Sequence, residues 1–178
     1  MGIEIGKKQY EPIEVINQAN RACGWFGAIA IFSIINSVLA FSKSDTTFVI
    51  GLGITTFIDA LASHIRQETQ GGIANFITII GFVINLILIG VFVLIWFLSK
   101  RGSKTVYIIG MVLYALDTLI FLVFKIWMGL AFHAFFLYCL VGGLGFINAR
   151  AQAESMHAAA AVIPNPATPE IQADNLPN

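Results

Sequence analysis

Long apolar runs constrain the fold of this chain more than any other feature of its sequence. A helix needs about 20 consecutive apolar residues to cross the hydrocarbon core of a bilayer. In lipid every backbone polar group must be paired within the segment, which leaves helices for runs of this length. The sequence therefore predicts an all-α polytopic transmembrane helical bundle with five hydrophobic segments, at residues 22–41, 47–65, 74–98, 105–124 and 127–147.

The composition supports a membrane protein and argues against a soluble one. Only 11% of the 178 residues are charged and 57% are hydrophobic, whereas soluble domains are about 25% charged. The formal net charge of +0 gives no general attraction to nucleic acid, so no nucleic-acid partner is expected. Cys23 and Cys139 fit neither a zinc spacing nor a disulfide framework, which favours buried apolar roles. The expected partners are the lipid bilayer and either other membrane protein subunits or further copies of the chain.

Three regions follow from the position of the apolar runs. Residues 1–21 are predicted to form a polar, interfacial N-terminal segment, and residues 22–148 the transmembrane helical bundle. Residues 149–178 are Ala- and Pro-rich and are predicted to be a largely disordered tail. The first run is longer than the core of a signal peptide, so we expect it to stay in the mature protein as a span.

The second run is the weakest of the five, because Gly51, Gly53 and Asp59 interrupt it. These residues leave open a re-entrant segment that does not cross the membrane. With five spans, Lys and Arg divide five against five between the two sides, so the charge rule sets no orientation. With a re-entrant second segment they divide seven against three, which would place both termini in the cytoplasm. The length of the run favours five spans, and the orientation stays open.

Polar residues recur at helical spacing within the apolar runs. Such stripes face other helices or a cavity rather than lipid, and most Ser, Thr, Asn and Gly positions in them serve helix packing. The clearest stripes are Ser33, Asn36 and Ser37 in the first run, Gly51, Thr55, Asp59 and Ser63 in the second, Thr78 and Asn85 in the third, and Gly110, Tyr114, Asp117 and Phe121 in the fourth.

The ionisable residues are more informative about function than the neutral polar ones, because an Asp near the centre of a membrane helix costs about 2.5–3.5 kcal/mol on insertion. Asp117 lies eight residues before Lys125, which marks a turn, and His133 lies eight residues after it. In an antiparallel hairpin both side chains sit about 12 Å from that turn. Asp59 reaches a similar depth if the second run crosses the membrane, and Tyr114 lies one turn deeper. The sequence therefore predicts an intramembrane polar cluster of Asp59, Asp117, His133 and Tyr114.

Such a cluster has three uses, and the sequence keeps all three open. Our leading interpretation is a small non-enzymatic integral membrane protein, a subunit of a membrane complex or a homo-oligomer, in which the cluster is structural. The alternative is a proton- or cation-linked transporter or channel that uses Asp59, Asp117 and His133. A membrane metal- or haem-binding protein comes third. No catalytic residue is predicted, and any metal or cofactor is left unassigned.

The membrane part of the chain, residues 22–145, resembles small bacterial multi-span integral membrane proteins of uncharacterised activity. The resemblance is seen in residues 50–59, 110–117 and 132–138. The resemblance implies a bacterial cytoplasmic (inner) membrane. It brings no activity and no functional residue.

Overall fold

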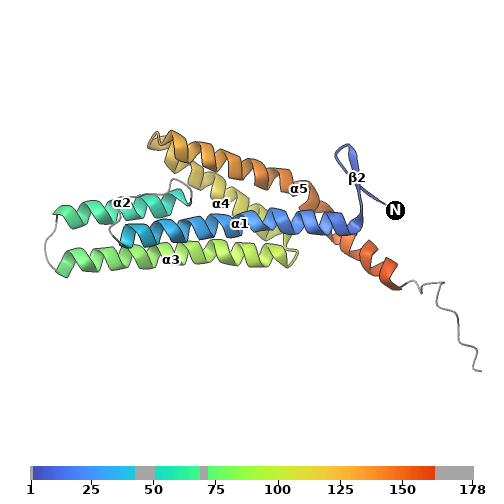
Figure 1. The fold of residues 1–178 in the computed structure, drawn as a ribbon, viewed down its shortest axis with the longest axis horizontal. Helices are drawn as coiled ribbons and strands as arrows, with labels where there is room; N and C mark the ends of the chain where they lie inside the picture. Colours follow the sequence, from blue (N-terminus) through green and yellow to red (C-terminus); the bar gives the residue numbers. More distant parts are fainter. Residues whose placement is uncertain (1, 43–50, 69–71, 163–178) are drawn as a thin grey trace, which may run out of the picture.

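The protein is a bundle of helices with a short hairpin at its N-terminus (Figure 1). The computed structural model describes residues 2–42, 51–68 and 72–162. Their elements in chain order are β1 (Ile3–Ile5), β2 (Lys8–Tyr10), α1 (Pro12–Phe41), α2 (Gly53–Glu68), α3 (Gly72–Lys100), α4 (Lys104–Val123) and α5 (Trp127–Val162). The predicted all-α helical bundle is confirmed, and the antiparallel pair β1–β2 is its one addition among these residues.

Local signals in the sequence set several of the helix ends. α1 begins at Pro12, whose fixed φ suits the first helical position, and the Glu14 carboxylate accepts a hydrogen bond from the Glu11 N–H at 3.0 Å. Ser103 caps α4, because its hydroxyl oxygen accepts from the N–H of Val106. α4 ends in a tight turn in which Lys125 adopts a φ of 55°.

The core lies where α1 runs between α3 and α5 (Figure 1). Phe26 of α1 is fully buried, and its ring meets Phe92 of α3 and Tyr107 of α4 at 6.4 and 5.3 Å between centroids. The Tyr107 hydroxyl donates a hydrogen bond of 2.7 Å to the carbonyl oxygen of Leu140, which ties α4 to α5. The buried phenol is thus both packed and hydrogen-bonded, as a Tyr in an apolar core requires.

Among the described residues, four helices are long and apolar enough to cross a membrane. They are α1, α3, α4 and α5, with apolar spans at Pro12–Leu39, Asn75–Lys100, Lys104–Val123 and Trp127–Ala161. α2 has 16 residues and is not one of these four. The structure therefore gives four long apolar helices and one short helix where the sequence predicts five spans. The first part of the second run, residues 47–50, lies outside the described residues.

Two of the predicted boundaries differ from the structure, one at each end of the bundle. Residues 12–21, predicted to be part of an interfacial segment, are the first turns of α1, and Val15 is fully buried there. Residues 149–162, predicted to belong to the disordered tail, continue α5, and Ala153 packs against Val15 and Ile3. These contacts with the β1–β2 hairpin stabilise helical turns that have little apolar periodicity of their own. The rest of the predicted tail, residues 163–178, lies outside the described residues.

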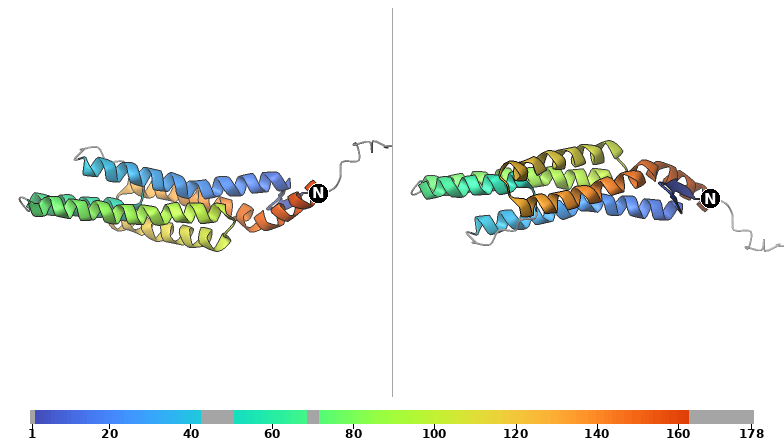
Figure 2. Two further views of the ribbon diagram at one scale, coloured as in Figure 1. Left: turned by 90° about the horizontal axis from the view of Figure 1, so that it is seen from below. Right: turned by 90° about the horizontal axis from the view of Figure 1, so that it is seen from above.

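The α2–α3 hairpin extends further than the other helices at one end of the bundle (Figures 1 and 2). Phe41, the last residue of α1, packs on Phe82 of α3 with 4.9 Å between ring centroids. Phe124, at the end of α4, stacks on Phe57 of α2 at 5.5 Å. About ten residues of α2 and of α3 lie beyond these two contacts. At 1.5 Å per residue, the hairpin extends about 15 Å past the end of α1 and the α4–α5 turn.

Candidate functional site

The Asp117 carboxylate lies at the start of α2 and caps that helix from the side of α4. One carboxylate oxygen, Oδ2, accepts from the N–H of Gly53 at 2.7 Å, and the other, Oδ1, accepts from the N–H of Ile54 at 2.8 Å. The first N–H groups of a helix have no partner within the helix, and they form the positive end of its dipole. The Asp117 carboxylate, which is 7% exposed, accepts hydrogen bonds from these groups and complements the dipole.

His133 of α5 completes the pairing of this carboxylate. Its Nε2 lies 3.1 Å from Oδ2 of Asp117, and its Nδ1 lies 2.9 Å from the carbonyl oxygen of Gly129. A carbonyl oxygen only accepts, so Nδ1 carries a proton. The contact between Nε2 and Oδ2 requires a second proton between those two atoms. An imidazolium facing a carboxylate satisfies both contacts, and the pair then has no net charge.

Two aromatic rings enclose the His133 imidazole. Tyr114 stacks on it with 4.7 Å between centroids and an interplanar angle of 13°, and Phe121 lies at 4.3 Å. Both residues belong to α4, one turn before and one turn after Asp117. The two rings hold the imidazole in place beside the Asp117 carboxylate. His133 itself is fully buried.

The segment that leads into α2 depends on two glycines. Gly51 has a φ of 148°, a conformation that side chains disfavour. A Cβ on Gly53 would lie 2.5 Å from a ring carbon of Phe121, so only glycine lets α2 approach Asp117 this closely. Between them, the N–H of Leu52 donates to the Ser33 hydroxyl of α1 at 2.8 Å. The start of α2 is therefore fixed to α1 and α4 together.

Asp59 makes its contacts elsewhere, on the side of α2 that faces α3. Its Oδ1 accepts from the Asn85 side-chain amide at 2.6 Å. Asp59 lies six residues after Gly53, about 9 Å along the helix. Of the four residues of the predicted cluster, the structure thus brings Asp117, His133 and Tyr114 together, and it pairs Asp59 with Asn85.

The residues that the sequence analysis missed are the backbone N–H groups of Gly53 and Ile54. No side chain marks them, so a search for polar side chains cannot find them. The signal that could have done so is the Gly51-Leu52-Gly53 stretch before an apolar helix that lacks a Ser, Thr, Asp or Asn N-cap of its own. A helix start of this kind needs an acceptor from elsewhere in the fold.

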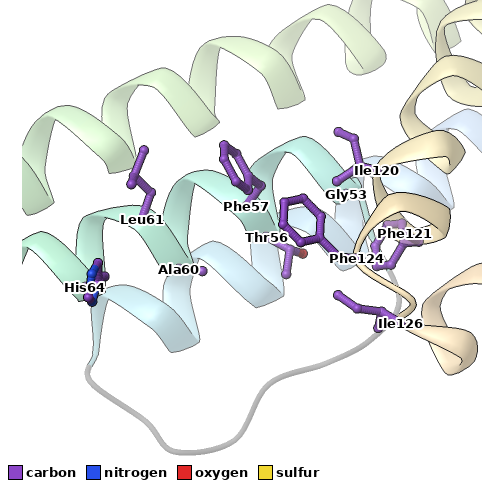
Figure 3. A pocket seen from close by; sticks show the side chains of 10 residues that line it. All are labelled: Gly53, Thr56, Phe57, Ala60, Leu61, His64, Ile120, Phe121, Phe124 and Ile126. Carbon is purple, nitrogen blue, oxygen red and sulfur yellow. The ribbon is translucent and has the colours of Figure 1, made fainter.

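A half-open cavity of about 300 Å³ lies beside the capped start of α2 (Figure 3). It runs along α2 to His64, and the end of α4 closes its other side. Its walls are almost wholly apolar, so it offers space for hydrocarbon rather than for a polar substrate. The lining residues are Gly53, Thr56, Phe57, Ala60, Leu61, His64, Ile120, Phe121, Phe124 and Ile126.

The chemistry of the site is that of a fully paired ion pair. Asp117 accepts three hydrogen bonds and His133 makes two, so neither group turns a reactive atom toward an open space. Within the described part of the chain, no three His, Cys, Asp or Glu side chains are grouped so as to hold a metal ion. No protein-family model, curated protein or solved structure matches this chain. The resemblance to small bacterial membrane proteins stays a prediction.

Proposed function

We propose that the protein is a non-enzymatic integral membrane protein that works as a subunit of a membrane assembly, with other membrane proteins or with further copies of itself. Four helices of the described chain have the length and composition of membrane spans. Their outward faces carry large apolar side chains, among them Ile87 of α3, Leu116 of α4 and Tyr138 of α5. These faces suit contact with lipid or with other apolar helices.

In the proposed topology α2 is re-entrant and both chain termini lie on one side of the membrane. The N–H of Leu52 bonds to Ser33, eight residues before the end of α1. The chain has therefore returned about 12 Å toward the middle of the bundle before α2 begins. α2 then runs antiparallel to α3, with Thr55 level with Asn85, and ends on the side where α1 ended.

The charge rule supports this topology and gives it an orientation. The side of the termini carries seven basic residues and the other side three, and the side with more Lys and Arg is normally cytoplasmic. We therefore propose that both termini are cytoplasmic, in a bacterial inner membrane. The seven are Lys7, Lys8, Arg21, Lys100, Arg101, Lys104 and Arg150, and the three are Lys43, Arg66 and Lys125.

The observation that carries the proposal is the extended α2–α3 hairpin. The apolar run of α1 and the whole of α4 are each about as long as the hydrocarbon core is thick. The hairpin extends about 15 Å beyond them, so its tip lies past the core in this placement. Exposed apolar patches outside lipid mark interaction sites. The tip exposes Leu61, Ile73, Phe76, Ile79 and Ile80, and no other described element covers them.

The Asp117–His133 pair is then the structural joint of this interaction hairpin. It holds the start of α2, while the tip extends from the opposite end of the same helix. A fully paired, neutral group of this kind is suited to fixing geometry. This supports a structural role for the polar cluster.

Native mass spectrometry in mild detergent, with size-exclusion chromatography and light scattering, tests the proposal. The wild-type protein should carry a partner or be oligomeric. The double variant Ile73→Ala plus Phe76→Ala should weaken the assembly by roughly 10-fold or more, because it removes two exposed anchors from the tip. The matched control is Leu116→Ala plus Leu119→Ala, on the exposed face of α4, which should leave the assembly unchanged.

A monomeric wild-type protein without a partner would contradict the proposal. Equal weakening by the tip pair and the α4 pair would also contradict it, because the tip would then have no special role.

A proton- or cation-linked transporter is the second candidate, and the pairing of Asp59 with Asn85 favours it. A carboxylate without a basic partner inside an apolar bundle is a common feature of ion pathways. In proteoliposomes this candidate requires an ion flux that Asp59→Asn abolishes while assembly survives. If wild-type liposomes carry no flux beyond that of empty ones, this candidate is excluded.

A further inference from the structure

Polar groups from three helices meet around Asp59. The Thr55 carbonyl oxygen and the Asp59 carboxylate come from α2, the Asn85 amide from α3 and the Ser37 hydroxyl from α1. Thr55, Asn85 and Ser37 are almost completely buried, and Asp59 is half-buried. We call these four residues the Asp59 seam.

The hydrogen bonds of the seam leave one buried oxygen atom without a donor. The Asn85 Nδ2 donates to Asp59 at 2.6 Å and approaches the Thr55 carbonyl oxygen at 3.4 Å. The Ser37 hydroxyl also donates to the Asp59 carboxylate. Among the described residues, the Oδ1 of Asn85 has no hydrogen-bond partner, and a buried amide oxygen without a donor needs an explanation.

The charge of Asp59 is also unbalanced. Two ion pairs join described residues, His133 with Asp117 and Arg150 with Glu154, and Asp59 takes part in neither. One negative charge therefore lies in the seam without a cationic side chain. A charge in an apolar environment is normally paired or bound to a cation.

We propose that the Asp59 seam binds a small monovalent cation, with Na⁺ as the ion to test. Carboxylate, carbonyl, amide and hydroxyl oxygens are the hard ligands that such ions take. One carboxylate balances a single positive charge, whereas a divalent ion would leave an excess charge in the apolar bundle.

In this proposal the side chain of Asn85 has one orientation when the cation is bound and another when it is absent. Turning its amide by about 180° replaces Nδ2 with Oδ1 at the position that faces Asp59. The Asn85 amide oxygen then faces the Asp59 carboxylate and the Thr55 carbonyl oxygen, and the Ser37 hydroxyl that contacts Asp59 is the fourth oxygen ligand in the proposal. Without the ion, the amide N–H₂ faces Asp59 in its place, as the 2.6 Å contact records.

Binding at this place links α1, α2 and α3 near the root of the protruding hairpin. The inference goes beyond the proposed assembly role, because the seam and the hairpin tip involve different residues. The experiments can therefore find an assembly without a cation site, or a cation site without an assembly, so failure of one proposal is distinguishable from failure of the other.

The full-length protein in detergent tests the proposal by thermal unfolding in NaCl and in choline chloride at equal ionic strength. We expect Na⁺ to raise the unfolding midpoint by roughly 5 °C when it exceeds its dissociation constant about 100-fold. A binding assay with radioactive Na⁺ should find one ion per chain.

Two variants and two matched controls decide whether the effect belongs to the seam. Asp59→Asn and Asn85→Leu should lose both the shift and the bound Na⁺. Glu68→Gln, an exposed acidic position on the same helix, and Asn75→Leu, an exposed amide on α3, should keep both. Asp59→Asn keeps the shape of the side chain, so its folding in choline chloride is the check that lost binding is not lost structure.

Three results would overturn the proposal. They are equal stability of the wild type in the two salts, a Na⁺ shift that survives in Asp59→Asn, and a stabilisation by low pH with no dependence on Na⁺. The last result would assign a proton to Asp59 in place of a cation.

Discussion

Two acidic side chains meet the same short helix, α2, in opposite ways. Asp117 approaches α2 from α4, and its carboxylate is fully paired by two backbone N–H groups and by His133. Asp59 belongs to α2 itself, and its side-chain donors are the neutral groups of Asn85 and Ser37. The first carboxylate is paired with an imidazole, whereas the second has no basic side chain as a partner among the described residues.

The difference shows how a carboxylate that fixes the structure of an apolar bundle can be distinguished from one that binds a ligand. Burial alone does not distinguish the two residues, since each is an Asp in contact with neighbouring helices. The count of donors does distinguish them. A carboxylate whose every direction is used fixes geometry, whereas one that lacks a positive partner has room for a ligand.

Replacing His133 by Phe should give the largest effect, because it leaves the Asp117 charge buried without its partner. Phe fits the space between Tyr114 and Phe121, so the loss is mainly electrostatic. We expect a loss of about 3–5 kcal/mol in the free energy of unfolding, measured by denaturant titration in detergent micelles.

A second substitution provides the control for that experiment. Asp117→Asn removes the unpaired charge, so the double variant His133→Phe plus Asp117→Asn should be more stable than His133→Phe alone. If the double variant is the less stable of the two, the two residues do not form a charge pair.

Replacing Gly53 by Ala should have an intermediate effect, because it pushes α2 away from Asp117. The new methyl group would lie 2.5 Å from Phe121 and 3.2 Å from the Asp117 carbonyl oxygen. Overpacking of this kind costs about 1–3 kcal/mol. Gly90→Ala in α3 is the control, since nothing lies within 4 Å of its added carbon, and it should be neutral or slightly stabilising. Equal losses in the two variants would show that the close approach has no role.

Replacing Asp59 by Asn should have the smallest effect when measured in choline chloride. The new amide oxygen still accepts from Asn85, so the free energy of unfolding should change by less than about 1 kcal/mol. A loss as large as that of His133→Phe would mean that Asp59 is also a structural joint, and the contrast between the two carboxylates would fail.

Much of the bundle could be predicted, because the apolar runs report directly on long helices. The pairing of Asp117 with His133 also follows from sequence, since equal spacing around Lys125 puts both at one level of a hairpin. Their contact is a matter of helix geometry, which the chain sets locally.

The partner of Asp59 could not be predicted in the same way. Asn85 stands on a separate helix, and its level depends on where α2 begins. The start of α2 depends in turn on backbone groups of Gly53 and on a carboxylate 64 positions later in the chain. Distances of this kind come from tertiary packing and leave no periodic signal. The turns at residues 12–21 and 149–162 were missed for a similar reason, since contacts with the β1–β2 hairpin hold them.

The same separation of 64 positions has a consequence for the order in which the chain matures. A ribosome that has finished α1, α2 and α3 has not yet made the carboxylate that caps α2. His133 follows later still, after the turn at Lys125. α2 is thus synthesised before the residues that fix its position. In a nascent chain that stops after α3, the first N–H groups of α2 lack the Asp117 carboxylate as their acceptor.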